Sequence, residues 1–139
     1  MSSPLLPPDY RPRVREKFMN SMMREYFRRK LEHWREELLQ ESSETLQNLQ
    51  NGGLHEPDLA DRASAETDTS LELRTRDRMR KLISKIDQAL QRIEDGSYGY
   101  CQETDEPIAI SRLEARPIAT LSLEAQERHE RREKVHRDD

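Results

Sequence analysis

Two long stretches of the sequence repeat a stripe of mostly apolar positions at alternating intervals of four and three residues. In the first, from about 19 to 50, the stripe is Phe27, Leu31, Trp34 and Leu38, followed after a one-residue offset by Leu39, Ser42, Leu46 and Leu49. In the second, from about 58 to 95, it is Leu71, Thr75, Met79, Leu82, Ile86, Leu90 and Ile93. This spacing marks one face of a supercoiled helix. The sequence therefore predicts two long helices that pack together as a coiled-coil hairpin.

The segment between the two stretches is expected to form the tip of that hairpin. Gly52 and Gly53 favour a helix end, because glycine adopts the left-handed conformation without a Cβ penalty. Pro57 prevents the first helix from continuing. Asp58 is a good N-cap for the second helix, and Asp61 adds a carboxylate near its positive dipole end. Capping is the simplest interpretation of both acids, and contact with a partner is the alternative.

Composition limits what this chain can be. Of its 139 residues, 37% are charged and 32% are hydrophobic, which suits long helix packing better than a broad globular core. The net charge of -4 offers no basic footprint for nucleic acid, so we expect a protein partner. No signal peptide or membrane span is recognisable, and a single cysteine, Cys101, fits a reducing compartment. We therefore expect a cytoplasmic protein that does not bind membranes or specific DNA sequences.

The composition changes after Gly96, which is expected to end the second helix. The segments 97–102 and 108–110 flank a polar turn and predict a short two-stranded ribbon. A brief helical turn then stops at Pro117, and Ser122 is expected to cap a last, highly charged helix. The predicted core of this region is Tyr98, Tyr100, Ile108, Ile110, Leu113, Ile118, Leu121 and Leu123, with Leu121 and Leu123 docking the last helix.

The predicted fold class is mainly α: a long antiparallel coiled-coil hairpin with a small ribbon-containing base and a C-terminal helix. The expected parts are a flexible, proline-rich and basic N-terminal arm at 1–18, the hairpin at 19–95 with its tip at 54–64, the base at 96–120 and the C-terminal helix at 121–139. Because the hairpin buries its own apolar stripe, a monomer is the default expectation.

Several segments together resemble a known family. They are 61–63 (Asp-Arg-Ala), 70–83, 98–101 (Tyr-Gly-Tyr-Cys) and 112–117 (Arg-Leu-Glu-Ala-Arg-Pro). On these segments the chain resembles the DksA/TraR transcription factors, over about residues 10 to 134. The resemblance implies a non-enzymatic regulator whose hairpin enters the secondary channel of RNA polymerase. Asp61, Arg62 and Ala63, with Asp58 in support, would then meet elements near the active centre and shift unstable promoter complexes toward dissociation.

The resemblance also implies a zinc site that this sequence has lost. The family carries four cysteines beside the hairpin, and the corresponding positions here are Cys101, Thr104, Ser122 and Ala125. Threonine, serine and alanine do not supply the ligands that a structural zinc site needs. The alternatives His129 and His136 are seven residues apart on the outgoing helix, where surface positions are the better interpretation. The sequence therefore predicts no zinc and a degenerate zinc-finger-like region.

A regulatory ligand is the third implication of the resemblance. The family responds to guanosine tetraphosphate (ppGpp), which binds between factor and polymerase in the stringent response. Carried over by position, that site takes Leu82, Lys85 and Arg116, whose positive charges suit a ligand with two diphosphates. A lysine of the family is replaced by Gln126, a loss that Arg112 or Arg128 nearby could offset. Without the resemblance, Lys85 would be read as an ordinary exposed lysine.

Two other functions stay open at the level of sequence. A factor similar to the Gre proteins would use its tip acids to help polymerase hold a magnesium ion and cleave its transcript, and Asp58 and Asp61 are three residues apart. A coiled-coil adaptor unrelated to polymerase is equally compatible with the helical periodicity. Transcript cleavage by stalled complexes and polymerase pull-down would separate these alternatives.

Overall fold

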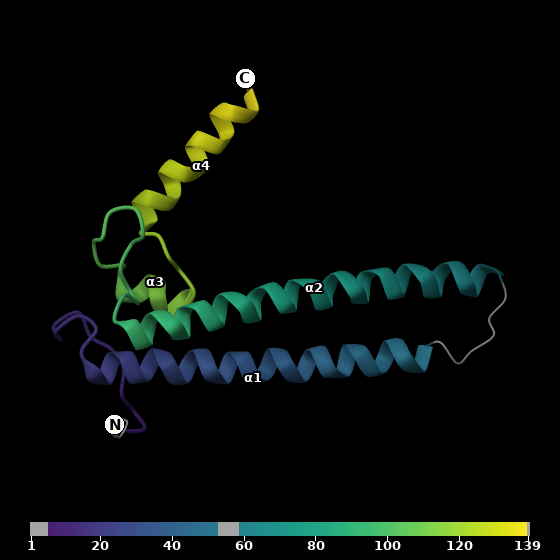
Figure 1. Ribbon diagram of the computed structural model, residues 1–139, viewed down its shortest axis with the longest axis horizontal. Helices are drawn as coiled ribbons and strands as arrows, with labels where there is room; N and C mark the ends of the chain where they lie inside the picture. The colour runs from purple at the N-terminus through teal and green to yellow at the C-terminus, as the bar shows by residue number, and fades with distance from the viewer. Residues whose placement is uncertain (1–5, 53–58, 139) are drawn as a thin grey trace. The chain divides into compact units, whose positions relative to one another are not determined.

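The computed structural model of the protein describes residues 6–52 and 59–138. These residues form four helices, α1 (Ser21–Gly52), α2 (Leu59–Asp95), α3 (Ile110–Ala115) and α4 (Leu123–Asp138) (Figure 1). None of these helices has a stretch of the length and low charge needed to span a bilayer. The prediction of a mainly helical fold, with two long helices followed by a small base and a C-terminal helix, is confirmed.

The chain divides into two compact units. One consists of residues 32–87, and the other combines residues 1–31 with residues 88–139. The boundary falls within both long helices, so each unit contains a part of α1 and a part of α2. We call the first the hairpin unit and the second the base unit.

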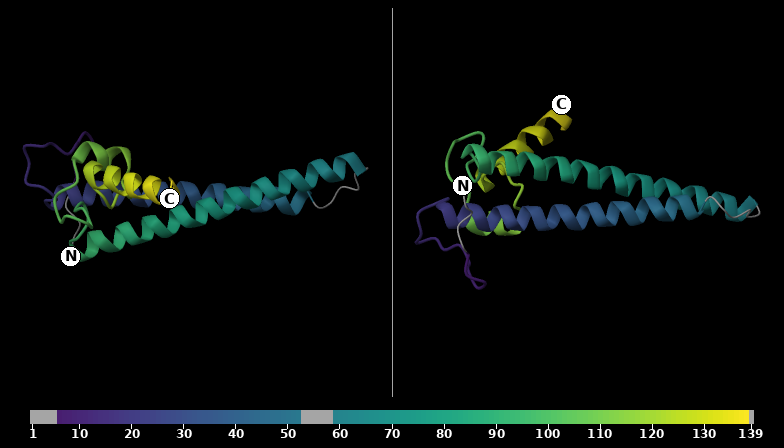
Figure 2. Two further views of the ribbon diagram at one scale, coloured as in Figure 1. Left: turned by 90° about the horizontal axis from the view of Figure 1, so that it is seen from above. Right: turned by 60° about the horizontal axis from the view of Figure 1, so that its bottom comes forward.

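The hairpin unit is an antiparallel pair of helical segments, which lie side by side in all views (Figure 2). Leu38 and Ile86 are buried in it, and the guanidinium of Arg35 donates to Asp87 at 2.7 Å (Nε to Oδ1). Leu39, however, is 40% exposed, although the sequence placed it on the apolar stripe. Adjacent helical residues point about 100° apart, so Leu38 and Leu39 cannot both face the partner helix.

The apolar stripe of α2 also weakens toward the tip. Leu71 is 53% exposed, which makes its assignment to the packed stripe wrong, whereas Met79 and Leu82 are half-buried and Ile86 is fully buried. Small polar residues replace large apolar ones in the tip half, so less apolar surface is available there to cover Leu71.

The predicted helix ends agree with the structure where it describes them. Helix α1 ends at Gly52, and α2 begins at Leu59. Asp58, the predicted N-cap of α2, lies outside the described residues. At the other end of α2, Gly96 has φ 86° and its N–H donates to the carbonyl of Arg92 at 2.9 Å. A glycine in this left-handed conformation closes α2, as expected from the sequence.

The core of the base unit draws on both long helices. Its buried residues are Met23, Phe27 and Leu31 of α1, Ala89 and Ile93 of α2, and Tyr98, Cys101, Ile108, Leu113 and Ala125 beyond them. The rings of Phe27 and Tyr98 lie 5.6 Å apart, and the Tyr98 hydroxyl donates to the carbonyl of Pro117 at 2.8 Å. Tyr98 therefore packs against α1 and ties the start of the base to its later part.

The predicted ribbon is reduced to one antiparallel bridge, between Tyr100 and Pro107. The N–H of Cys101 donates to Glu106 at 2.8 Å, and the N–H of Ile108 donates to Gly99 at 2.7 Å. No strand forms among the described residues, so the prediction of two strands is wrong. Within the turn, the N–H of Asp105 donates to the carbonyl of Cys101 at 2.8 Å and the N–H of Glu106 donates to the Thr104 hydroxyl at 3.3 Å, so these groups do not extend the ladder.

Helices α3 and α4 begin and end close to the predicted positions. Helix α3 stops before Pro117, and the N–H of Ala125 donates to the hydroxyl of Ser122 at 3.2 Å, which confirms Ser122 as the cap of α4. Leu123 is 54% exposed, so the expectation that it docks α4 is wrong. Ala125 is the buried residue of α4 instead, since it lies on the face of the helix that carries the Ser122 bond.

Three further members of the predicted core are half-buried and one is exposed. Ile110, Ile118 and Leu121 are half-buried, and Tyr100 is exposed at 37%. The ring of Tyr100 meets Phe18 edge-on at 5.3 Å, so it contacts the N-terminal arm on the outside of the core.

Residues 6–20 of the arm contact the base unit at several points. The Tyr10 hydroxyl donates to Glu16 at 2.7 Å, and Arg11 donates to the Tyr26 hydroxyl at 3.2 Å. Tyr10 and Tyr26 also stack edge-to-face at 6.0 Å. These contacts fix one course for the arm, and its mobility in solution stays a prediction.

Gly99 and Gly96 provide a matched pair for testing the packing of the arm. Both have positive φ, but a Cβ at Gly96 would meet no atom within 4 Å, whereas a Cβ at Gly99 would lie 3.1 Å from Met19 and 3.2 Å from Phe18. Gly96→Ala should lower the free energy of unfolding by about 1–2 kcal/mol, the backbone cost alone. Gly99→Ala should lower it further in urea unfolding, because the arm must also shift. Equal losses would show that the arm does not pack on Gly99.

Candidate functional site

The residues expected at the tip lie at the start of α2. Asp61 is the third residue of α2, and Arg62 and Ala63 follow it within the same helix. An acidic, a basic and a small residue thus follow one another in the first turns of α2. Asp58 lies outside the described residues.

The residues expected to bind ppGpp are distributed over both units. In the hairpin unit, Leu82 is half-buried and Lys85 is exposed on α2. In the base unit, Arg116 is exposed immediately after α3, and its N–H donates to the carbonyl of Arg112 at 2.7 Å. Gln126 of α4 donates to Glu130 at 3.1 Å (Nε2 to Oε1). Lys85 and Arg116 are therefore both accessible within their own units.

Arg116 and Arg112 line one groove of about 590 Å³ in the base unit, together with Ser122 and Glu124. The Nε of Arg112 donates to the carbonyl of Leu121 at 2.9 Å. Arg112 therefore helps to hold the segment before α4 in place, which limits its ability to replace the lysine that the resemblance implies at position 126. Arg128, the other candidate for that replacement, is exposed on α4.

The four positions aligned with the family's cysteines come together in the base unit. Cys101, Ser122 and Ala125 are buried, and Thr104 is half-buried. The sulfur of Cys101 accepts hydrogen bonds from the Thr104 hydroxyl and from the backbone N–H groups of Ser122, Thr104 and Glu103. A further backbone bond, from the N–H of Gln102 to the carbonyl of Thr120 at 2.9 Å, joins the same two segments. We call Cys101, Thr104, Ser122 and Ala125 the CTSA cluster.

The hydrogen bonds to Cys101 change its acidity. Burial raises the pKa of the thiol, but the donors around the sulfur favour the thiolate more strongly and lower the pKa to about 6. The sulfur is thus an acceptor surrounded by donors, and Cys101 itself is 1% exposed. Its chemistry is that of a buried structural group, because an oxidant has little access to it.

Comparison with known proteins agrees with these observations. Residues 23–93 match the family described as DnaK suppressor protein DksA, N-terminal domain, and residues 96–131 match the prokaryotic dksA/traR C4-type zinc finger. The chain belongs to the DksA family. The DksA matches cover α2 up to Ile93, most of α1, and the base up to α4.

Individual DksA proteins are similar over nearly the whole chain. The RNA polymerase-binding transcription factor DksA of Caulobacter vibrioides is 69% identical over 131 residues, which is 94% of this chain and 92% of the relative. The protein of the same name from Escherichia coli is 44% identical over 125 residues, covering 90% of this chain and 83% of the relative. These relatives are named as transcription factors and not as enzymes, in agreement with the sequence prediction.

A solved DksA structure supports the fold. The structure of transcription factor DksA2 from Pseudomonas aeruginosa has a TM-score of 0.80 and 40% identity, and covers 84% of this chain and 90% of that chain. The similarity therefore extends well beyond one pair of helices. A coiled-coil adaptor unrelated to DksA would need to resemble this structure only in its helical pair.

The C4 zinc finger of the DksA family needs four ligands that this chain does not provide. Of the CTSA cluster only Cys101 is a ligand that zinc prefers, since hydroxyl groups bind it poorly and alanine not at all. In residues 6–52 and 59–138, no three His, Cys, Asp or Glu side chains are grouped in a way that could hold a metal ion. His129 is exposed and lies 3.5 Å from Glu133 on α4. The residues present therefore do not fit the family's zinc site.

Sequence reasoning missed one polar network in the base unit. Glu114 of α3 accepts hydrogen bonds from Lys30 at 2.8 Å and from the Tyr26 hydroxyl at 2.9 Å, both from α1. Burial alone would raise the pKa of the Glu114 carboxyl. The hydrogen bonds from Lys30 and Tyr26 outweigh this effect, so the pKa lies below its ordinary value. No local pattern could reveal the contact, because α3 is more than 80 residues away from its partners in sequence.

Substitution of Cys101 tests its role as an acceptor. Cys101→Ala leaves the Thr104 hydroxyl and nearby N–H groups without a partner, so it should lower the free energy of unfolding by about 1–3 kcal/mol. Cys101→Ser keeps an acceptor and should cost less in the same urea titration, with little effect on activity. If serine and alanine destabilise equally, the hydrogen bonds to the sulfur do not stabilise the fold.

Proposed function

We propose that this protein binds RNA polymerase directly through its secondary channel and, together with ppGpp, modulates transcription initiation by destabilising promoter complexes. The observation that carries the proposal is its 69% identity, over 94% of the chain, to a protein named as an RNA polymerase-binding transcription factor. As a partner of polymerase it would act in the cytoplasm, and as a hairpin that buries its own seam it would act as a monomer.

The helical architecture suits the proposed mode of action. The hairpin unit is a pair of continuous helices whose far end carries Asp61, Arg62 and Ala63. Such a pair is stiff and narrow, about 10–12 Å across for each helix, and so can carry a small set of side chains into a channel. Ala63 is small enough to allow a close approach, and Asp61 adds charge. A factor that binds one state of a promoter complex more tightly than another shifts the balance between them without catalysis.

The proposed response to ppGpp rests on exposed positive side chains in the base unit and in the hairpin unit. Lys85 and Arg116 are exposed, and each can form charge-assisted bonds with phosphate, while Leu82 offers an apolar contact. Gln126 stands where the family is expected to have a lysine, so one positive charge is missing from the ppGpp site. Arg112 could replace that charge, but its guanidinium is already bonded to the carbonyl of Leu121. We therefore expect a ppGpp response that is present but weaker than with a lysine at position 126.

The base unit is proposed to work without zinc. The CTSA cluster joins the segment after α2 to the start of α4 through hydrogen bonds to Cys101 and the Ser122 cap, which are the connections that a metal would otherwise make. The buried methyl group of Ala125 fills the fourth position.

Metal independence predicts that the purified protein contains no stoichiometric zinc and keeps its melting temperature in a strong chelator. Atomic absorption and calorimetry measure the two quantities. A relative that has all four cysteines is the control, and its melting temperature should fall. One mole of tightly held zinc per mole of this chain would contradict the proposal.

The tip prediction concerns Asp61→Asn, which removes a charge and conserves shape. Affinity for polymerase should stay unchanged, whereas the shortening of promoter-complex lifetime seen with the parent protein should largely disappear. Stability should fall by less than about 1 kcal/mol, the scale of a helix-dipole contribution. If the variant shortens promoter-complex lifetime to the same extent as the parent protein, the charge of Asp61 only stabilises the start of the helix.

Two further assays, transcript cleavage by stalled complexes and binding to purified polymerase, separate the alternative functions. A Gre-like factor would increase transcript cleavage in stalled complexes, and Asp61→Asn would abolish that cleavage. A coiled-coil adaptor would show no affinity for purified polymerase in either form.

The ppGpp prediction concerns Lys85→Ala and Arg116→Ala. Each should remove a charge-assisted contact worth on the order of 1.5–3 kcal/mol and so raise the ppGpp concentration needed for half-maximal effect by about tenfold or more. Activity without ppGpp should change much less, since neither residue is at the tip. If both variants respond to ppGpp at the same concentrations as the parent protein, ppGpp does not bind at Lys85 and Arg116. Gln126→Lys is the converse variant and should lower the required concentration.

A further inference from the structure

An apolar groove of about 480 Å³ lies between the N-terminal arm and the entry into α3, entirely within the base unit. The arm contributes Pro12, Val14 and Phe18, and the other wall contains Ile108, Ala109 and Ile110. Most of these side chains are apolar, so water in the groove has few hydrogen-bonding partners. Displacing that water with an apolar side chain would be favourable.

Two carboxylates also line the groove, and both have partners in the base unit. Glu16 accepts hydrogen bonds from the Tyr10 hydroxyl at 2.7 Å and from the N–H of Arg13 at 3.4 Å. Glu114 is bound by Lys30 and Tyr26, as described above. Lys30 pairs with Glu114, and two hydrogen bonds from neutral donors occupy Glu16, so both carboxylates already have partners within the base.

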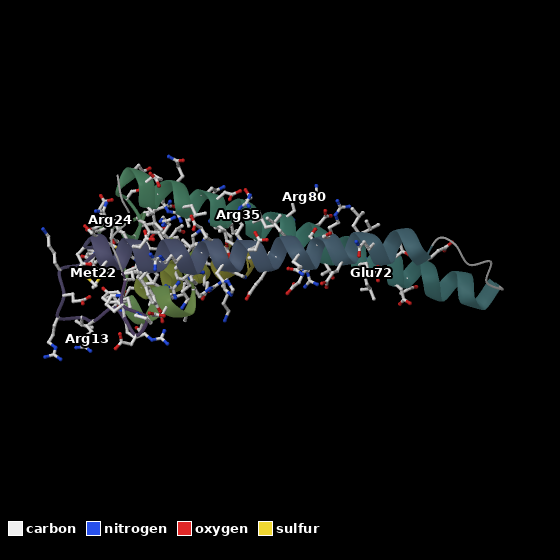
Figure 3. All side chains as sticks on the ribbon, turned by 90° about the horizontal axis from the view of Figure 1, so that it is seen from below. Arg13, Met22, Arg24, Arg35, Glu72 and Arg80 are labelled. Atoms are coloured by element: carbon white, nitrogen blue, oxygen red, sulfur yellow. The ribbon has the colours of Figure 1, made fainter. Side chains whose placement is uncertain are left out.

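Val14 is a surface feature that folding does not explain. Its side chain is 90% exposed, more than any other large exposed hydrophobic residue in the described part of the chain. Two exposed arginines, Arg13 and Arg15, flank it directly, and Arg13 points away from the helices in Figure 3. An apolar groove and an exposed valine are therefore combined with a local excess of positive charge, in a protein whose net charge is -4.

We propose that this groove and its basic edge, formed by Val14, Arg13 and Arg15, bind an acidic segment of RNA polymerase that carries an exposed apolar side chain. The apolar side chain would enter the groove beside Val14, and flanking carboxylates would pair with the two arginines. Charge complementarity selects an acidic segment, and the apolar lining selects protein over nucleic acid, because a phosphate backbone has no group to fill the groove. The inference rests on the proposed function and adds a second contact outside the tip.

The proposal assigns the two contacts different effects. Binding at the groove would set affinity and the salt dependence of association, since exposed charges mainly steer encounter. The tip would set the effect on promoter complexes after binding. Substitutions at the groove should therefore weaken binding, whereas Asp61→Asn should not.

The test measures the affinity of the fluorescently labelled full chain for purified bacterial core RNA polymerase. Val14→Asp and the double variant Arg13→Gln/Arg15→Gln should each bind about tenfold more weakly, and the double variant should lose part of the salt dependence. Val135→Asp is the matched control, because Val135 is also exposed, at 60%, but lies on α4 outside the groove. All four substituted positions are exposed, so circular dichroism should show parental folding and melting.

Each outcome decides the proposal. Parental affinity of the groove variants, or an equal loss in Val135→Asp, would overturn it while leaving the proposed function intact. Failure of the parent chain itself to bind polymerase would overturn both. A short DNA duplex serves as the second probe: loss of DNA binding in the double variant, with polymerase binding unchanged, would make the basic edge a nucleic-acid contact and overturn the proposal.

Discussion

The packing of Phe27 against Tyr98 is the contact on which the base of this protein depends. It joins α1 to the segment that follows α2, and both side chains are almost completely buried. Tyr26, next to Phe27, extends the aromatic contacts to Tyr10 in the arm. Truncation of a buried aromatic residue typically costs about 3–5 kcal/mol, a large part of the stability of a small domain. Only 5% of the residues of this chain are aromatic. Because Tyr10, Tyr26, Phe27 and Tyr98 contact one another in the base, a small core can hold several segments together.

The CTSA cluster connects two segments of the base through hydrogen bonds and packing of its own residues. Cys101 accepts several hydrogen bonds, Ser122 caps α4, and the methyl group of Ala125 fills space between them. Each replacement is individually weaker than a zinc–ligand bond, but none requires a metal supply. The neighbouring packing of Tyr98 and Leu113 supplies the remaining stability through burial of apolar surface.

Local sequence patterns predicted what depends on local chemistry. Gly96 at the end of α2 and Ser122 at the start of α4 were recognisable because helix ends need particular backbone conformations and side-chain acceptors. The bond from Lys30 to Glu114 and the burial of Ala125 were not, because they depend on which segments meet in space. The ribbon was overestimated because the alternating apolar residues suggest strands, whereas the N–H groups of Asp105 and Glu106 form bonds within the turn. The roles of Asp61 and Lys85 came from family resemblance, since helical spacing alone also fits an ordinary surface.

The central claim is that the hairpin places its tip inside polymerase, and site-specific photocrosslinking tests it most directly. A photoreactive amino acid would replace Glu66, which is exposed on α2 near the tip, or Glu94, which is exposed near the other end of the same helix. With purified RNA polymerase, the probe at 66 should crosslink to residues that line the secondary channel close to the active centre, and the probe at 94 should not. Crosslinking of the probe at 66 to the outer surface of the enzyme, or to the same residues as the probe at 94, would contradict the account.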